Sequence, residues 1–181
     1  KIACQGIENL LIDATERPHC RPADNAEQED MYSGKKKRHT MKNTVISTVS
    51  KWILFMGNTF SGHHHDYSML KTEFPPEHPW FETIQAFVDL GYQGIKSDYR
   101  GKNIEIPHKK SRKSKKNPEP KLTAEQKAEN QAISRTRILV ENAIAGIKRF
   151  NILVHAFRNR KPTMDDQAIF ICAGLWNFLL A

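Results

Sequence analysis

Residues 123–150 carry the pattern that most constrains the fold, because it predicts one long amphipathic helix. Thr123 and Gln126 have the spacing of a capping box, in which each side chain binds a backbone N–H at the start of the helix. No proline follows until Pro162. The helix can therefore run unbroken to about Phe150.

Two neighbouring stripes of side chains run along this predicted helix. The apolar stripe consists of Ile133, Val140, Ile144 and Ile147. The polar stripe, one residue or about 100° further round, consists of Ser134, Arg137, Glu141 and Lys148. Glu141 has a cation on either side and lies next to the apolar stripe. Such a carboxylate could lie at the edge of the core and face a cleft. The alternative is an exposed helix with ion pairs one turn apart, each worth a few tenths of a kcal/mol. The helix alone favours that alternative, so the choice depends on the rest of the chain.

The charge of the chain indicates a polyanionic partner. The 181 residues contain 28 Lys and Arg against 20 Asp and Glu, a net charge of +8, which favours nucleic acid over a membrane. Three widely spaced cysteines, Cys4, Cys20 and Cys172, show neither a disulfide framework nor zinc spacing. The apolar run from Ala168 to Leu180 is too short to span a membrane. We therefore expect a single domain in a reducing compartment.

Two predicted strands each lead into an aspartate. Ile7–Ile12 ends in a continuous apolar run before Asp13, and Ile84–Val88 repeats the pattern before Asp89. Open sheets place their chemistry at the carboxyl ends of central strands. If the two strands are neighbours, Asp13 and Asp89 converge. The alternative is that each is a solvated turn residue.

The other predicted elements complete an α/β fold. Thr40–Trp52 and Ile53–Phe60 have strand composition, and a tight turn around Lys51 would join them as a hairpin. Ile104–Ile106 is a further short strand, and a last helix runs from about Pro162 to Leu180. We expect a mixed sheet, with three antiparallel strands followed by parallel ones, flanked by helices.

Three consecutive histidines, His63 to His65, precede Asp66 and suggest a metal site. Adjacent side chains on an extended chain point in alternate directions, so they rarely bind one ion. The favoured interpretation is a loop in which His65 and Asp66 cap a helix over Tyr67–Glu73. Asp66 and His65 remain secondary candidates for a metal-proximal pair.

Two basic segments are candidates for contact with phosphate backbone. Residues 35–38 precede a strand, and residues 109–121 combine positive charge with prolines, which predicts a mobile tether. A solubilising linker is an equal alternative for the second segment. The candidate DNA-binding residues are Lys35, Lys36, Lys37, Arg38, Lys109, Lys110, Arg112, Lys113, Lys115 and Lys116.

Asp13, Asp89 and Glu141 could together hold two divalent cations. Carboxylate oxygens suit Mg²⁺ or Mn²⁺, and a metal pair about 4 Å apart can stabilise both the attacking and the leaving oxygen of a phosphodiester displacement. Three acids far apart in a sequence are a weak signal by themselves, since any soluble chain offers many such triples.

Several motifs in the same order resemble the DDE transposases of bacterial insertion sequences. They are Ile12–Pro18, Tyr32–His39, Gly62–Asp66, Asp89–Tyr92 and Val140–Ala143. The resemblance is to the group similar to insertion sequence 5, related to insertion sequence 4 and to Harbinger-type eukaryotic elements. It implies a ribonuclease H-like fold, dependence on Mg²⁺ for which Mn²⁺ can substitute, and cutting and joining of DNA at element ends. The family's catalytic and metal-binding triad falls on Asp13, Asp89 and Glu141.

The related signature of Tyr, Arg, Glu and Lys falls on the polar stripe. Arg137, Glu141 and Lys148 match it, and Ser134 stands in place of the tyrosine. The resemblance implies that Arg137 and Lys148 contact DNA phosphates and that the protein assembles as an oligomer on paired ends. It also implies a place in the bacterial cytoplasm, associated with the nucleoid. Relatives carry an N-terminal helix-turn-helix region, which we expect to be absent here, so that residues 1–181 form a single catalytic domain. The alternatives are a non-catalytic DNA-binding remnant and a basic RNA-associated protein.

Overall fold

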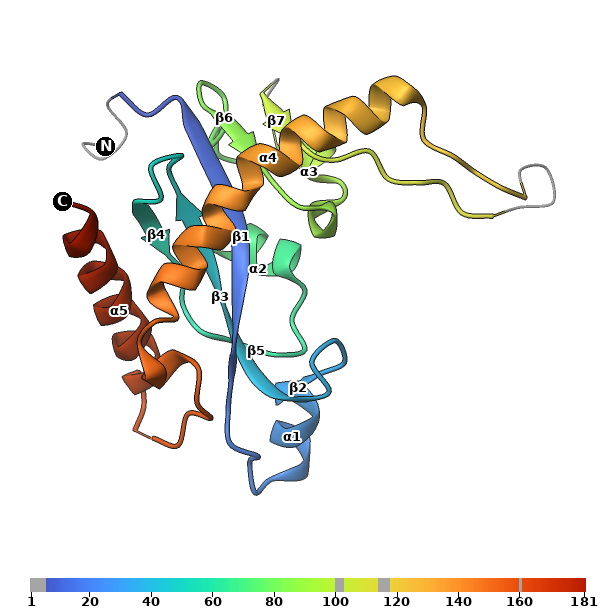
Figure 1. Cartoon of the computed structure of the whole chain (residues 1–181). Coiled ribbons are helices and arrows are strands. Elements are labelled where there is room, and N and C mark those ends of the chain that lie inside the picture. Colours follow the sequence, from blue (N-terminus) through green and yellow to red (C-terminus); the bar gives the residue numbers. More distant parts are fainter. Residues whose placement is uncertain (1–5, 100–102, 114–117, 160) are drawn as a thin grey trace.

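The computed structural model describes residues 6–99, 103–113, 118–159 and 161–181, and it forms a mixed sheet flanked by helices (Figure 1). The central strand β1 (Asn9–Pro18) pairs with β3 (Arg38–Ser47) on one side, antiparallel, and with β6 (Gln85–Phe87) on the other, parallel. The short strand β7 (Ile104–Glu105) continues the parallel side. Three further strands pair with β3 in antiparallel fashion: β2 (Tyr32–Ser33), β4 (Ile53–Met56) and β5 (Phe60–Ser61).

The predicted order of the sheet is confirmed, but the extent of β1 is not. β1, β3 and β4 form the antiparallel set, and β6 and β7 run parallel to β1. β1 does not end at Asp13. Its residues up to Pro18 pair with β3, where Pro18 lies opposite Thr40, and this ladder keeps the chain extended beyond the aspartate. Asp13 therefore lies in the middle of the strand.

The predicted hairpin is present between β3 and β4. Lys51 has a φ of 70°, and the backbone N–H of Thr48 donates to the carbonyl of Trp52 at 2.9 Å. The first strand of the hairpin ends at Ser47, earlier than expected, because residues 48–52 form the turn, in which the N–H of Lys51 donates to the carbonyl of Thr48 at 3.0 Å.

The long helix α4 (Ala124–Ile147) begins as the capping box predicts. Thr123 Oγ1 accepts from the N–H of Gln126, and the N–H of Thr123 donates to Gln126 Oε1, each at 3.1 Å. The helix crosses β1 and also contacts β3, β6 and α5 (Met164–Leu180) (Figure 1). The residues that it buries are Ile133, Val140, Ala143, Gly146 and Ile147.

Three shorter helices complete the fold. α1 (Asn25–Met31) occupies a segment with a loop-like sequence, because the Asp24 side chain accepts from the N–H of Glu27 and caps it. α2 (Asp66–Glu73) is the predicted helix, but its N-cap is His65, without a side-chain capping bond. α3 spans Ile95–Asp98, and short 3₁₀ turns span Leu90–Tyr92 and Asn151–Leu153. Across the described ranges, no helix has the length and apolar character needed to cross a bilayer.

Apolar clusters on both faces of the sheet determine which way the acids of β1 point. Leu10 and Ile12 pack in the cluster that contains residues of α2 and α3, whereas Leu11 packs against α4 and α5. Side chains alternate along a strand. Asp13 therefore shares the face of Leu11 and points toward α4.

Candidate active site

Asp13 and Asp89 are brought together by the register of two neighbouring parallel strands. Leu11 of β1 lies opposite Phe87 of β6, and each aspartate follows its pairing residue by two positions. The predicted adjacency of the two strands is confirmed. Asp89 caps the turn that follows β6, where its Oδ1 accepts from the N–H of Leu90 at 2.6 Å.

One arginine from α4 bridges the two aspartates. Arg137 Nη2 donates to Asp13 Oδ2 and Nη1 donates to Asp89 Oδ1, both at 3.2 Å. The Arg137 side chain is only 12% exposed, against 18% for Asp13 and 48% for Asp89. The arginine of the polar stripe thus points into the sheet, and the exposed-helix alternative is wrong for this residue.

Burial of the Asp13 side chain disfavours the charged form of its carboxyl group. Burial raises the pKa of the Asp13 carboxyl above its usual value, and the charges of Asp89 and Asp66 raise it further. The N–H of Ala14, which donates to Asp13 Oδ1 at 2.8 Å, and the Arg137 guanidinium act in the opposite direction. The ionised form of Asp13 therefore depends on a neighbouring cation.

Glu141, the third predicted acid, is exposed on α4. It follows Arg137 by four residues, which is one turn and about 6 Å along the helix axis. Within the described ranges, no three or more His, Cys, Asp or Glu residues lie close enough to hold a metal ion. The three-acid site stays a prediction.

The pair of aspartates has the chemistry that a divalent cation requires. Both supply hard carboxylate oxygens, which Mg²⁺ prefers. The guanidinium between them is a cation that already binds one oxygen of each. A cationic group thus occupies the point where Asp13 and Asp89 converge, and the two residues fit a metal ion there.

Lys148 and the β2–β3 turn add positive charge beside this site. Lys148 Nζ donates to the carbonyl of Glu16 on β1 at 3.1 Å. Burial lowers the pKa of Lys148, and the charge of nearby Lys36 lowers it further. Asp13 also acts on the Lys148 ammonium, so Lys36 and Asp13 each lie within electrostatic reach of Lys148. The exposed residues of the turn are Lys35, Lys36, Lys37 and Arg38.

The second basic segment lies between β7 and α4. Its described residues Lys109, Lys110, Arg112 and Lys113 are exposed and outside regular secondary structure. Lys115 and Lys116 fall outside the described residues. In Figure 1 the described residues that follow β7 extend away from the sheet, and residues 118–123 lead to the start of α4.

The secondary candidates Asp66 and His65 have other local roles. Lys42 Nζ donates to Asp66 Oδ1 at 3.0 Å and to the carbonyl of His64 at 2.8 Å. Asp66 is the first residue of α2 rather than its N-cap, so the capping role expected for it is wrong. Its charge nonetheless reaches Asp13.

Sequence reasoning missed Tyr92, which lies behind the acids. Its side chain is fully buried, and its hydroxyl has no hydrogen-bond partner among the described residues. Burial raises the pKa of Tyr92 well above its usual value, and the charges of Asp13, Asp66 and Asp89 act in the same direction. The motif Asp89–Tyr92 was the available signal, but it does not reveal which way the phenol points.

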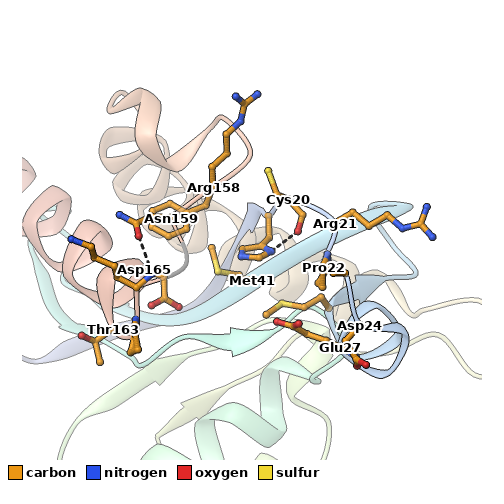
Figure 2. A pocket seen from close by; sticks show the side chains of 16 residues that line it. Cys20, Arg21, Pro22, Asp24, Glu27, Met41, Arg158, Asn159, Thr163 and Asp165 are labelled. Carbon is orange, nitrogen blue, oxygen red and sulfur yellow. Dashed lines mark hydrogen bonds between the residues drawn. The ribbon is translucent and has the colours of Figure 1, made fainter.

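A cavity of about 500 Å³ lies at the far end of β1, away from the aspartates (Figure 2). It is formed by residues 19–24, by α1 and by residues 157–159 and 161–165, with Met41 among its lining side chains. Arg21 and Arg158 extend outward, and acids including Asp24 and Glu27 also line it. Because both signs of charge meet there, the cavity does not present a single-sign site for phosphate.

Comparisons with known proteins identify the family of this chain. A family model described as DDE superfamily endonuclease matches residues 12–177. The probable transposase for insertion sequence element IS702 of Microchaete diplosiphon is 35% identical over 176 residues, which cover 96% of this chain and 58% of the relative. This chain therefore spans little more than half of that relative's length. No solved structure matches it.

Proposed function

The chain belongs to the DDE superfamily of endonucleases, and from this premise we propose that it is the catalytic domain of a transposase, which cuts and rejoins DNA strands at insertion-sequence ends. The observation that carries the proposal is the shared binding of Arg137 by Asp13 and Asp89. Two carboxylates on neighbouring parallel strands, held around one cation, form the donor set that metal-dependent phosphodiester chemistry needs.

The metal ligands in this proposal are Asp13, Asp89 and Glu141. A bound Mg²⁺, for which Mn²⁺ would substitute, would polarise the attacking oxygen and neutralise charge on the leaving oxygen. β1 and β6 fix the two aspartates through their paired backbones. Glu141 would approach from α4, where its exposed side chain is free to change rotamer. Asp13 and Asp89 would therefore determine where the metal binds, and Glu141 would supply the third ligand from α4.

The cations around the aspartates would hold the DNA backbone. Lys148, Arg137 and Lys36 supply positive charge near the acids, and the described residues Lys109, Lys110, Arg112 and Lys113 add exposed charge before α4. Contacts of this kind position a duplex without reading its sequence.

We further propose a ribonuclease H-like architecture within a single domain over residues 1–181. The strand order β4-β3-β1-β6-β7, antiparallel first and parallel afterwards, supports it. Assembly as a homo-oligomer on paired DNA ends, in the bacterial cytoplasm at the nucleoid, belongs to the same proposal. The mobile character expected of residues 109–121 is proposed for 109–113 and 118–121, since residues 114–117 lie outside the described residues.

Metal-dependent nicking of a duplex that carries cognate inverted repeats tests the proposed function. Asp13→Asn, Asp89→Asn and Glu141→Gln should each abolish nicking under Mg²⁺ and Mn²⁺. Glu125→Gln, which changes an exposed acid in the first turn of the same helix as Glu141, is the matched control and should stay active. Full activity of any triad variant rejects that residue. Salt-sensitive DNA binding by the wild type without any nicking would instead support a non-catalytic remnant.

A further inference from the structure

Arg137 occupies the point where the two aspartates converge. Its two terminal nitrogens lie 3.2 Å from Asp13 Oδ2 and from Asp89 Oδ1, so the guanidinium joins both carboxylates at once. The side chain is 12% exposed. No other Lys or Arg among the described residues forms an ion pair with either aspartate. Arg137 therefore supplies the charge that offsets the repulsion between the two acids.

The present position of Arg137 leaves one of its donors unused. Its Nε is buried and has no hydrogen-bond partner among the described residues. A buried donor without an acceptor is destabilising relative to one that is paired. The two bonds to the aspartates thus hold the side chain in a place that does not satisfy the whole guanidinium.

A divalent cation and the guanidinium cannot share this place. Mg²⁺ binds carboxylate oxygens at about 2.0–2.1 Å, and an ion bound to both aspartates would replace Arg137 at the oxygens to which it now donates. Two cations held there would also repel each other. Metal binding at Asp13 and Asp89 therefore requires the Arg137 side chain to leave.

A DNA phosphate outside the sheet is a second type of partner that Arg137 could bind. Lys148 caps the C-terminus of α4 on the same polar stripe, and Lys36 lies near Lys148, so this face of the molecule attracts polyanions. A phosphate of the DNA backbone can accept two parallel bonds from a guanidinium, as a carboxylate does. The displaced arginine would thus exchange carboxylate oxygens for phosphate oxygens.

We propose that Arg137 is an exchangeable counter-ion, which neutralises Asp13 and Asp89 until a divalent cation enters and then moves to a DNA phosphate, so that metal and DNA bind cooperatively. This inference rests on the proposed function, because it uses the same acids and the same DNA. Coupling between two ligands is reciprocal: DNA strengthens metal binding by the same factor by which metal strengthens DNA binding. Couplings of this kind are typically on the order of tenfold.

The test is the affinity of the full chain for Mn²⁺, measured by titration calorimetry with and without a short duplex that lacks element ends. For the wild type, Mn²⁺ should bind about tenfold more tightly when the duplex is present. Arg137→Ala should bind Mn²⁺ more tightly than the wild type without DNA, and the duplex should then add little. Arg137→Lys keeps the charge but cannot bridge both aspartates, and its Mn²⁺ affinity without DNA should lie between those of the other two.

Arg135→Ala is the matched control. It removes an exposed arginine two residues earlier on α4 and should behave as the wild type. Equal Mn²⁺ affinity of wild type and Arg137→Ala without DNA overturns the counter-ion inference. If Asp13→Asn still abolishes Mn²⁺ binding in that case, the proposed function stands. Mn²⁺ binding that survives both Asp13→Asn and Asp89→Asn contradicts the inference and the proposed function together.

Discussion

Gly146 of α4 lies directly against the indole ring of Trp176 on α5. A Cβ added at Gly146 would stand 2.6 Å from three ring carbons of Trp176. The ring is held in place, because its Nε1 donates to the carbonyl of Lys51 at 3.0 Å. The absence of a side chain at Gly146 is therefore what lets the two long helices approach.

Gly146→Ala should destabilise the protein. Overpacking of a fixed contact typically costs about 1–3 kcal/mol, although alanine is the better helix former. The free energy of unfolding in urea, followed by circular dichroism, measures the loss. The control is Gly174→Ala on α5, where an added Cβ meets nothing within 4 Å. That variant should be more stable than the wild type by up to about 1 kcal/mol, and equal stability of the two variants would contradict the packing argument.

Arg17→Lys should also destabilise the protein. The Arg17 side chain is 1% exposed and donates from Nε and Nη2 to Asn43 Oδ1, at 3.1 and 2.9 Å, and from Nη2 to Thr59 Oγ1 at 3.0 Å. Burial lowers the pKa of Arg17 to about 10. A lysine ammonium cannot reproduce the forked arrangement of these bonds, so we expect a loss of about 1–3 kcal/mol.

The control for Arg17 is another arginine that makes a hydrogen bond at the surface. Arg21 is exposed and donates to Gln28 Oε1 at 2.8 Å. Arg21→Lys should change the free energy of unfolding by less than about 0.5 kcal/mol. The midpoints of thermal unfolding of the two variants test this prediction. Similar midpoints would show that the forked hydrogen bonds of Arg17 do not stabilise the protein more than a surface hydrogen bond does.

Glu73→Gln should stabilise the protein at neutral pH and lose that advantage in acid. Burial raises the pKa of Glu73 above its ordinary value of 4.5, so the folded state binds the proton more tightly than the unfolded state. The wild type therefore loses stability as pH rises from 4.5 through the raised pKa, and the full penalty applies at neutral pH. Glutamine carries no charge and can still accept from the N–H of Asn58, as Glu73 Oε1 does at 2.8 Å.

Urea unfolding of Glu73→Gln and wild type across this pH range measures the effect. The difference in free energy of unfolding should be largest at neutral pH and shrink below pH 4.5. Glu82→Gln changes an exposed glutamate and should change little. If the difference in free energy of unfolding between Glu73→Gln and the wild type grew in acid, the prediction would be contradicted.

Lys36→Ser should weaken DNA binding by removing a phosphate contact. Lys36 is exposed and lies near Lys148, which donates to the strand that carries Asp13. Each phosphate contact contributes about 0.9 to the slope of log K against log salt concentration, so the slope should fall by about that amount. Fluorescence anisotropy with a labelled duplex over a series of salt concentrations gives the slope. Lys71→Ser, which removes a cation paired with Asp98 at 3.4 Å, should leave it unchanged.

Local sequence signals predicted the elements that carry the site. The capping box fixed the start of α4 because its bonds lie within four residues. The apolar run before Asp89 marked a buried strand, and Lys51 marked the hairpin. The order of the motifs indicated the family, since several short patterns in one sequence are specific even when each alone is weak.

The positions that depend on long-range geometry could not be predicted in the same way. The extent of β1 beyond Asp13 is set by pairing with β3. The contact of Arg137 with both acids depends on where α4 crosses the sheet. Arg17 is buried although arginine is seldom found in a core, because Asn43 and Thr59, far along the chain, satisfy its donors.

The contacts of Arg137 join parts of the chain that are made at different times. The arginine follows Asp89 by 48 residues and Asp13 by 124. During translation, both acid-bearing strands leave the ribosome before the helix that neutralises them, and closing so long a loop is entropically unfavourable until the helix can dock. A nascent chain without α4 thus lacks the cation that bridges Asp13 and Asp89, and the two acids become neutralised only after α4 has been made.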